Sequence, residues 1–242
     1  MKERPILFSA PMVKALLADT KTQTRRLAKF KAIEPGFNLR FSGVSTGHYC
    51  TGVPSSGHVL YSRRAGGVWE QRTKPLHCPF GAPGDRLWVR ETWRTDVHAP
   101  AGVEGIRYRA DDGFKQHARA HDDAWAEQDR KPSAAGGKWR PSIYMQQWAS
   151  RIDLEVTGVR VERLNAISDD DAKAEGIERA WGHDVPATMG GNAKMWRDYG
   201  TTNAPFSNPC NSYRTLWESI NGPGSWAANP WVWVVEFKRV TP

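Results

Sequence analysis

The sequence predicts an α+β fold in which a small mixed sheet or barrel carries short helices and long polar insertions. Strand patterns occur near both ends and in the middle of the chain, and short helix patterns lie between them. Long stretches rich in Gly, Ser, Asn and Pro separate these elements. A chain of 242 residues can bury one sizeable core. We therefore expect a single domain over residues 1–242, with insertions at about 31–81, 98–149 and 180–229.

The first elements are a short strand and a short helix. "PILFS" at 5–9 is typical of a strand, and Pro11 suits the first turn of a helix. Apolar residues then recur at helical spacing on one face: Met12, Ala15 and Leu16. This pattern stops at the polar segment "DTKTQTRR" (19–26), whose bland interpretation is a solvated loop after the helix.

The middle of the chain predicts further β structure. A hairpin is expected near "HVLYSRR" (58–64), within otherwise loop-rich sequence. "APGDRLWVRETW" (82–93) combines a Pro-Gly-Asp turn with strand alternation that places Leu87 and Val89 on one face. We expect "GIRYRAD" (105–111) to be its partner strand.

The second half has the clearest patterns. "SRIDLEVTGVRVERL" (150–164) alternates as a strand and "WVWVVEFKRV" (231–240) reads as a mostly buried one. "SDDDAKAEGI" (168–177) predicts a helix that Ser168 caps and a glycine ends. A second helix is expected over 212–220, with one apolar side formed by Tyr213, Leu216, Trp217 and Ile220.

The overall composition favours a polyanionic partner. Lys and Arg number 34 and Asp and Glu 26, so the net charge is +8, which suits RNA or DNA. The 12 Trp residues could stack on bases, although core packing is the commoner use. The N-terminus lacks the pattern of a secretion signal, and no stretch approaches the roughly 18 apolar residues that span a membrane.

The cysteines do not form an evident framework. Cys50, Cys78 and Cys210 are odd in number and far apart, which indicates a reducing cytoplasm. A metal site that combined them with His48 and His77 is disfavoured, because the set lacks a Cys-x-x-Cys pair. We expect neither a metal nor an organic cofactor.

The motif at 19–26 supplies the resemblance to a known family. Together with the later strand and helix motifs in the same order, it resembles the ASCH domains of the PUA-like β-barrel superfamily, which carry Gly-x-Lys-x-x-Glu-x-Arg after the first helix. Asp19, Lys21, Thr24 and Arg26 occupy the four signature positions. Asp19 departs from the usual Gly, and Thr24 departs from the usual Glu. The resemblance implies a mixed β-barrel, and it extends to larger ASCH-like proteins of phages and prophages.

One branch of this family carries Thr at the position of Thr24. These small bacterial proteins have Lys-Thr-x-Thr-x-Arg and hydrolyse N4-acetylcytidine to cytidine and acetate. The resemblance implies a catalytic set of Lys21, Thr24 and Glu175, the last from an ungapped match of "ISDDDAKAEGI" (167–177) to the family's helix. It implies an amidohydrolase acting on an N4-acylated cytosine in a nucleoside, nucleotide or nucleic acid.

The chemistry of these residue types is consistent with amide hydrolysis. Thr24 offers a hydroxyl that attacks or positions water, and Lys21 can act as base if burial or nearby cations lower its pKa. Glu91 is the rival acid to Glu175. The side chains expected to contact the substrate are Arg26, Arg25, Glu91, Trp93 and Tyr108.

Two other functions stay open. A non-catalytic PUA-like module that binds RNA or DNA fits the basic charge equally well, and an ASCH-type ribonuclease is the third hypothesis. For Lys21 we further expect a surface position, at which replacement by alanine changes stability by about 0.5 kcal/mol or less.

Overall fold

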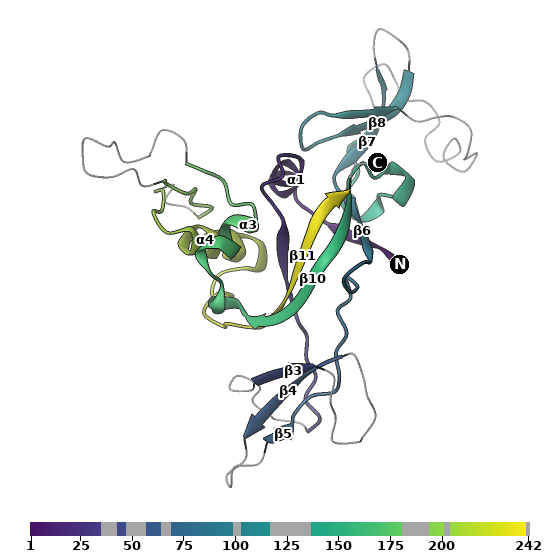
Figure 1. Ribbon diagram of the computed structural model, residues 1–242. Coiled ribbons are helices and arrows are strands. Elements are labelled where there is room, and N and C mark those ends of the chain that lie inside the picture. Colours follow the sequence, from purple (N-terminus) through teal and green to yellow (C-terminus); the bar gives the residue numbers. More distant parts are fainter. Residues whose placement is uncertain are drawn as a thin grey trace. The chain divides into compact units, whose positions relative to one another are not determined.

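The computed structural model confirms the mixed α+β class (Figure 1). It describes residues 1–34, 43–46, 57–63, 69–98, 103–116, 137–180, 194–200 and 204–240. Within these ranges the chain forms one five-stranded sheet and two three-stranded sheets, with a few short helices.

The chain forms two compact units. The first unit comprises Met1–Asp19, Asp85–Glu155 and Lys238–Pro242, and the second comprises Thr20–Gly84 and Val156–Phe237. The expected single domain stays a prediction. The expected insertions are not featureless, because each contributes described strands or helices.

The five-stranded sheet has the order β1-β6-β10-β11-β2. Its strands are β1 (Glu3–Leu7), β2 (Gln23–Leu27), β6 (Arg86–Arg90), β10 (Asp153–Arg163) and β11 (Trp231–Val240). β1 runs parallel to β6, whereas β10 is antiparallel to β6 and β11 is antiparallel to β2. β1 and β2 are its edge strands, so the described strands do not close into a barrel.

The N-terminal elements lie close to the positions that the sequence predicts. α1 (Ala10–Leu17) begins with Pro11 in its first turn and buries Met12, Val13, Ala15 and Leu16. It ends before Asp19, whose φ of 53° is a left-handed conformation that breaks the helix. The chain then enters β2, where Gln23, Thr24 and Arg25 are buried. The second half of the polar motif is therefore a largely buried edge strand and not a solvated loop, whereas Asp19, Thr20 and Thr22 are exposed.

The small sheet of the first unit corrects one predicted pairing. "RLWVRETW" divides into β6 and β7 (Trp93–His98), and β8 (Val103–Tyr108) pairs with β7 and not with β6. β9 (Phe114–Gln116) completes this sheet. Leu87, Trp88 and Val89 in the middle of β6 are buried, whereas Arg86 and Arg90 at its ends are partly exposed.

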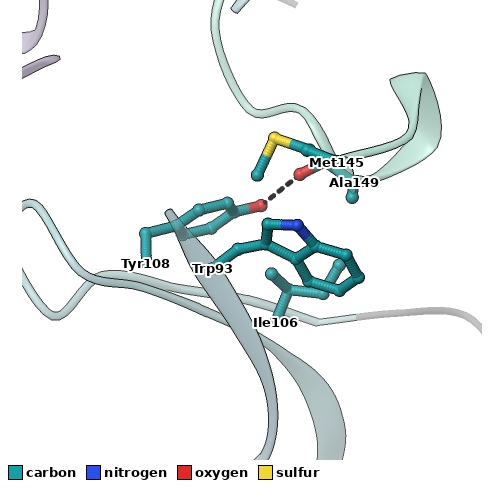
Figure 2. Close-up of a cluster of buried hydrophobic side chains, with 5 residues drawn as sticks. All are labelled: Trp93, Ile106, Tyr108, Met145 and Ala149. Carbon is teal, nitrogen blue, oxygen red and sulfur yellow. Dashed lines mark hydrogen bonds between the residues drawn. The ribbon is translucent and has the colours of Figure 1, made fainter. Parts of the chain in front are cut away.

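A compact core stabilises this part of the first unit (Figure 2). It consists of Trp93, Ile106, Tyr108, Met145 and Ala149. The Tyr108 hydroxyl donates a 2.7 Å hydrogen bond to the Ala149 carbonyl, which satisfies the one polar atom of its ring in a buried position. The last two core residues belong to a segment with two 3-10 turns, η2 (Ser142–Tyr144) and η3 (Gln147–Ala149).

The small sheet of the second unit confirms the hairpin near "HVLYSRR". β4 (His58–Arg63) pairs with β3 (Gly43–Thr46) and with β5 (Trp69–Gln71). Val59 and Leu60 of β4 are fully buried. The stretch that the sequence predicts as loops therefore carries a sheet of its own.

The remaining helices belong to the second unit. α3 (Asp169–Ala174) starts after Ser168, as predicted, and packs against α4 (Pro209–Asn221). A third 3-10 turn, η4 (Leu164–Ala166), joins β10 to α3. α4 buries three of the four expected apolar residues, but Ile220 is 61% exposed in the last turn of the helix, so that expectation is wrong.

Candidate active site

The segment after α1 is held between β11 and the end of α3. The Thr22 amide donates a 2.9 Å hydrogen bond to the Ala174 carbonyl, and the Phe237 amide donates one of 2.8 Å to the Thr22 carbonyl. Lys21 and Glu175 form an isolated antiparallel bridge beside this contact. The backbone thus brings together two residues that are 154 positions apart in the sequence.

α3 places the acidic member of this pair. The Ser168 hydroxyl accepts a 3.1 Å hydrogen bond from the Asp171 amide and caps the start of the helix, and Glu175 is the C-cap residue at its end. Gly176 follows with a φ of 79°, a left-handed conformation that turns the chain away. The end of the short helix therefore places Glu175 against the segment that carries Lys21.

Lys21 and Glu175 are in direct contact and are buried. The Lys21 Nζ lies 3.0 Å from Glu175 Oε2 and 2.7 Å from the Glu175 carbonyl oxygen. The other carboxylate oxygen, Oε1, accepts a 3.3 Å hydrogen bond from Arg25. Lys21 and Glu175 are each 3% exposed. The expected surface position of Lys21 is wrong, because β2 and the end of α3 cover its side chain.

Burial and charge act on the Lys21 amine in opposite directions. Burial lowers the pKa of Lys21, and Arg26 and Arg25 lower it further, whereas Glu175 raises it. The net effect is a pKa below the usual 10.5. A lysine with a lowered pKa carries the neutral amine at lower pH than usual and can accept a proton.

Arg25 serves the fold of this region. Its guanidinium contacts Asp171 at 2.9 Å and Glu162 at 3.2 Å, in addition to Glu175. Arg160 joins the same network through Asp171, Glu162 and Glu236. Because three carboxylates surround Arg25, it is engaged within the protein and is the least suited of the expected contact residues to hold a substrate.

Thr24 and Arg26 share the opposite face of β2. Along a strand alternate residues lie on one side, so these two side chains point away from Arg25. Across the ladder they oppose Val235 and Trp233 of β11. Thr24 is 4% exposed, and its hydroxyl has no hydrogen-bond partner among the residues that the structure describes.

Arg26 is electrostatically coupled to the ion pair. Burial lowers the pKa of Arg26, while Glu175 and Tyr213 raise it. Burial also raises the pKa of Tyr213 well above 10, and Glu175 adds to this shift. The structure therefore gathers five polar side chains of the second unit, here called the Glu175 cluster: Lys21, Arg25, Arg26, Glu175 and Tyr213.

Tyr213 is the member that the sequence did not indicate as a site residue. Its position on the apolar side of α4 predicts core packing, and its ring is indeed only 3% exposed. The influence of Glu175 on the Tyr213 hydroxyl follows from the packing of α4 against α3, which helical periodicity alone does not indicate.

Three of the expected substrate contacts lie in the first unit and have partners there. Glu91 is 2% exposed and accepts hydrogen bonds of 2.8 and 3.0 Å from Arg151. Arg151 also lies 4.1 Å above the Tyr108 ring and binds Asp111. Trp93 and Tyr108 belong to the core of Figure 2. Their burial favours packing roles, and Glu175, not Glu91, is the acid that contacts Lys21.

No group of three or more His, Cys, Asp or Glu side chains is placed to hold a metal ion within the described residues. Cys50 and His48 lie outside them. Among the helices described, none is long and apolar enough to cross a membrane. No family model, curated protein or solved structure that was compared with the chain matches it.

Proposed function

We propose that the protein is a hydrolase that removes an acyl group from N4 of a modified cytosine in a nucleoside or nucleotide. The observation that carries the proposal is the buried contact between Lys21 and Glu175, at 3.0 Å. These are two of the three catalytic residues that the resemblance to the ASCH amidohydrolases implies. We also propose that the chain has the PUA-like ASCH fold and that β2 and α3 carry its site.

Lys21 is the base in this proposal. Its neutral amine takes a proton from water or from the Thr24 hydroxyl, and the oxygen then attacks the acyl carbon. The lowered pKa supports this role, because a larger fraction of the amine is neutral near neutral pH than for an exposed lysine. If Thr24 attacks, a water molecule afterwards releases the acyl group as a carboxylic acid.

Glu175 and Arg26 assist the reaction. As the C–N bond breaks, the leaving N4 nitrogen takes up a proton that Glu175 relays from the Lys21 ammonium, to which it is hydrogen-bonded. Arg26 stabilises the negative charge that develops on the acyl oxygen. Water is consumed, and the products are the cytosine nucleoside or nucleotide with a free N4 amino group and the carboxylic acid.

The test is incubation of the protein with N4-acetylcytidine and chromatographic detection of cytidine. Wild type should form cytidine and acetate, whereas Lys21→Ala and Glu175→Gln should lose at least about 100-fold in kcat/KM, the usual contribution of a general acid or base. Lys14→Ala is the matched control, because Lys14 is an exposed lysine on α1. Absence of any cytidine with wild type would contradict the proposal.

The net charge of +8 favours nucleic acid binding as the second candidate function. A PUA-like module would retard RNA or DNA in a gel without forming product, and an ASCH-type ribonuclease would shorten RNA. Assaying the same preparation with acetylated and unmodified RNA separates these outcomes.

A further inference from the structure

A pocket of about 430 Å³ lies within the first unit, whereas the Glu175 cluster belongs to the second unit. One wall is β6, where Trp88 and Arg90 alternate onto the same face. The other wall is the segment of η2 and η3, which contributes Ile143, Tyr144 and Gln146. This volume is of the size that holds small ligands in proteins.

The segment that forms the second wall is held in place by the core of the first unit. Met145 lies between Tyr144 and Gln146 in sequence, is 1% exposed and packs in the core shown in Figure 2. Ala149 of the same segment accepts the hydrogen bond of the Tyr108 hydroxyl. The side chains at the rim are therefore carried by a backbone that the core holds in place.

Arg90 is a cation that no carboxylate of the described residues neutralises. Its guanidinium lies 4.6 Å above the Trp88 ring, and it donates one 3.3 Å hydrogen bond, to the Ile143 carbonyl. Throughout the described ranges no acid is within ion-pair distance of it, and its Nε has no partner. Arg151 in the same unit contrasts with it, because Glu91 and Asp111 both bind that side chain. An arginine with spare donors at a pocket is suited to bind an anion, phosphate above all.

Beside this cation stands an exposed aromatic ring. Tyr144 is 65% exposed and Ile143 is 56% exposed, although both residues are large and apolar enough to be buried elsewhere. An exposed tyrosine ring offers a stacking surface for a planar base. The amide of Gln146, which is also exposed, offers both donor and acceptor atoms to a base edge.

We propose that this pocket binds a nucleotide, with the base against Tyr144 and the phosphate at Arg90. The pairing of an unneutralised arginine with an exposed aromatic ring selects this ligand class, because an apolar ligand would leave Arg90 unused and a simple anion would leave the ring exposed. The site is independent of the hydrolysis proposed above. It would give the protein a binding site for nucleotides in addition to the site that binds the reacting base.

The experiment is fluorescence anisotropy with a labelled oligocytidylate of about ten nucleotides, within the span of a single-strand binding site. Wild type should bind it. Tyr144→Ala should weaken binding about tenfold because one base stack is lost, and Arg90→Gln should weaken binding about tenfold because the phosphate contact is lost. The matched controls are Trp69→Ala, which removes a 61% exposed aromatic ring, and Arg214→Gln, which removes a 54% exposed arginine side chain. Circular dichroism of each variant verifies folding, and Arg90→Lys retains the charge if Arg90→Gln does not fold.

Competition identifies the source of the ligand chemistry. CMP should displace the oligonucleotide better than cytidine does if the pocket reads phosphate, and displacement only by longer chains would assign the site to nucleic acid. Lack of binding by wild type, or equal binding by the pocket variants and the controls, would overturn the proposal. The pocket proposal and the hydrolase proposal can fail independently of each other. Lys21→Ala should bind the oligonucleotide normally, and Tyr144→Ala should still convert free N4-acetylcytidine.

Discussion

The buried Lys21–Glu175 pair has two consequences for stability at the level of single residues. Taking two charges out of water is costly, and their contact together with Arg25 offsets the cost. Removing one partner leaves a buried charge without its compensation. The effect should differ between the two partners, because replacing Glu175 removes the carboxylate that contacts both Lys21 and Arg25, whereas replacing Lys21 leaves Glu175 in contact with Arg25.

We predict that Glu175→Gln lowers the free energy of unfolding by about 3 kcal/mol and Lys21→Met by about 1–2 kcal/mol. Urea denaturation followed by circular dichroism measures both. Lys173→Met is the control, because Lys173 forms an exposed pair with Asp170 and its replacement should leave the denaturation midpoint nearly unchanged. A change for Glu175→Gln no larger than that of the control would show that the buried pair contributes nothing.

The lowered pKa of Lys21 predicts the direction of the pH dependence of hydrolysis. The base must be neutral, so kcat/KM should rise with pH through the folded pKa of Lys21 and level off below pH 10.5. For stability the sign is the same: below its folded pKa the buried ammonium costs free energy, and this cost is relieved as pH rises toward the unfolded pKa. Measuring kcat/KM between about pH 5 and pH 10 tests the prediction, because a lysine with a lowered pKa titrates within this range. Activity that falls over this range would exclude Lys21 as the base.

Cys210 should be unreactive in the folded protein. Burial raises its pKa to about 12, and Asp169, whose carboxylate accepts a 3.1 Å hydrogen bond from Sγ, adds to the shift. At pH 8 only about one thiol in ten thousand is then ionised. Iodoacetamide labelling read by peptide mass spectrometry should be at least about 100-fold slower for Cys210 in buffer than in urea. Equal rates would contradict the raised pKa of Cys210.

At the level of elements, α3 is the part on which the site depends most. It has only six residues, so its own hydrogen bonds give it little stability, and the Ser168 cap and packing against α4 hold it in place. Its C-terminal end carries Glu175, and fraying of the helix would therefore move the acid away from Lys21.

Ser168→Ala should cost about 1 kcal/mol of stability and lower activity through Glu175. Ser168→Thr keeps a hydroxyl at the cap and should recover most of both losses. Thermal unfolding and the cytidine assay measure the two effects, and a Ser168→Ala variant with wild-type stability would indicate that the cap is dispensable.

At the level of the whole molecule, the charge of +8 should separate two kinds of ligand. Binding of oligonucleotides releases counterions, so the logarithm of Kd should rise linearly with the logarithm of salt concentration. N4-acetylcytidine is uncharged, and its hydrolysis should change little over the same range. Affinity for oligocytidylate that does not respond to salt would argue against phosphate recognition.

Much of the element pattern can be predicted because it is local. The helix that Pro11 begins, the Ser168 cap, the strand at 231–240 and the hairpin near 58–64 each depend on neighbouring residues alone. The predicted pairing of the 82–93 and 105–111 segments was wrong in its partner, because a break after Arg90 moves the pairing to β7. The predicted burial of Ile220 was wrong, because helical periodicity does not show how far along the helix a covering element extends.

The sequence by itself determined the α+β class and the approximate positions of the main helices and strands, and its resemblance to the ASCH domains supplied the hypothesis that Lys21 meets Glu175. Only the tertiary structure decided that both are buried and that Arg25 contacts three carboxylates. It also decided that Trp93 and Tyr108 belong to a separate core and that Glu91 pairs with Arg151. The physical reason is that helix caps and strand alternation act over a few residues. Burial, by contrast, depends on which distant segments cover a side chain, and desolvation then determines what its charge can do.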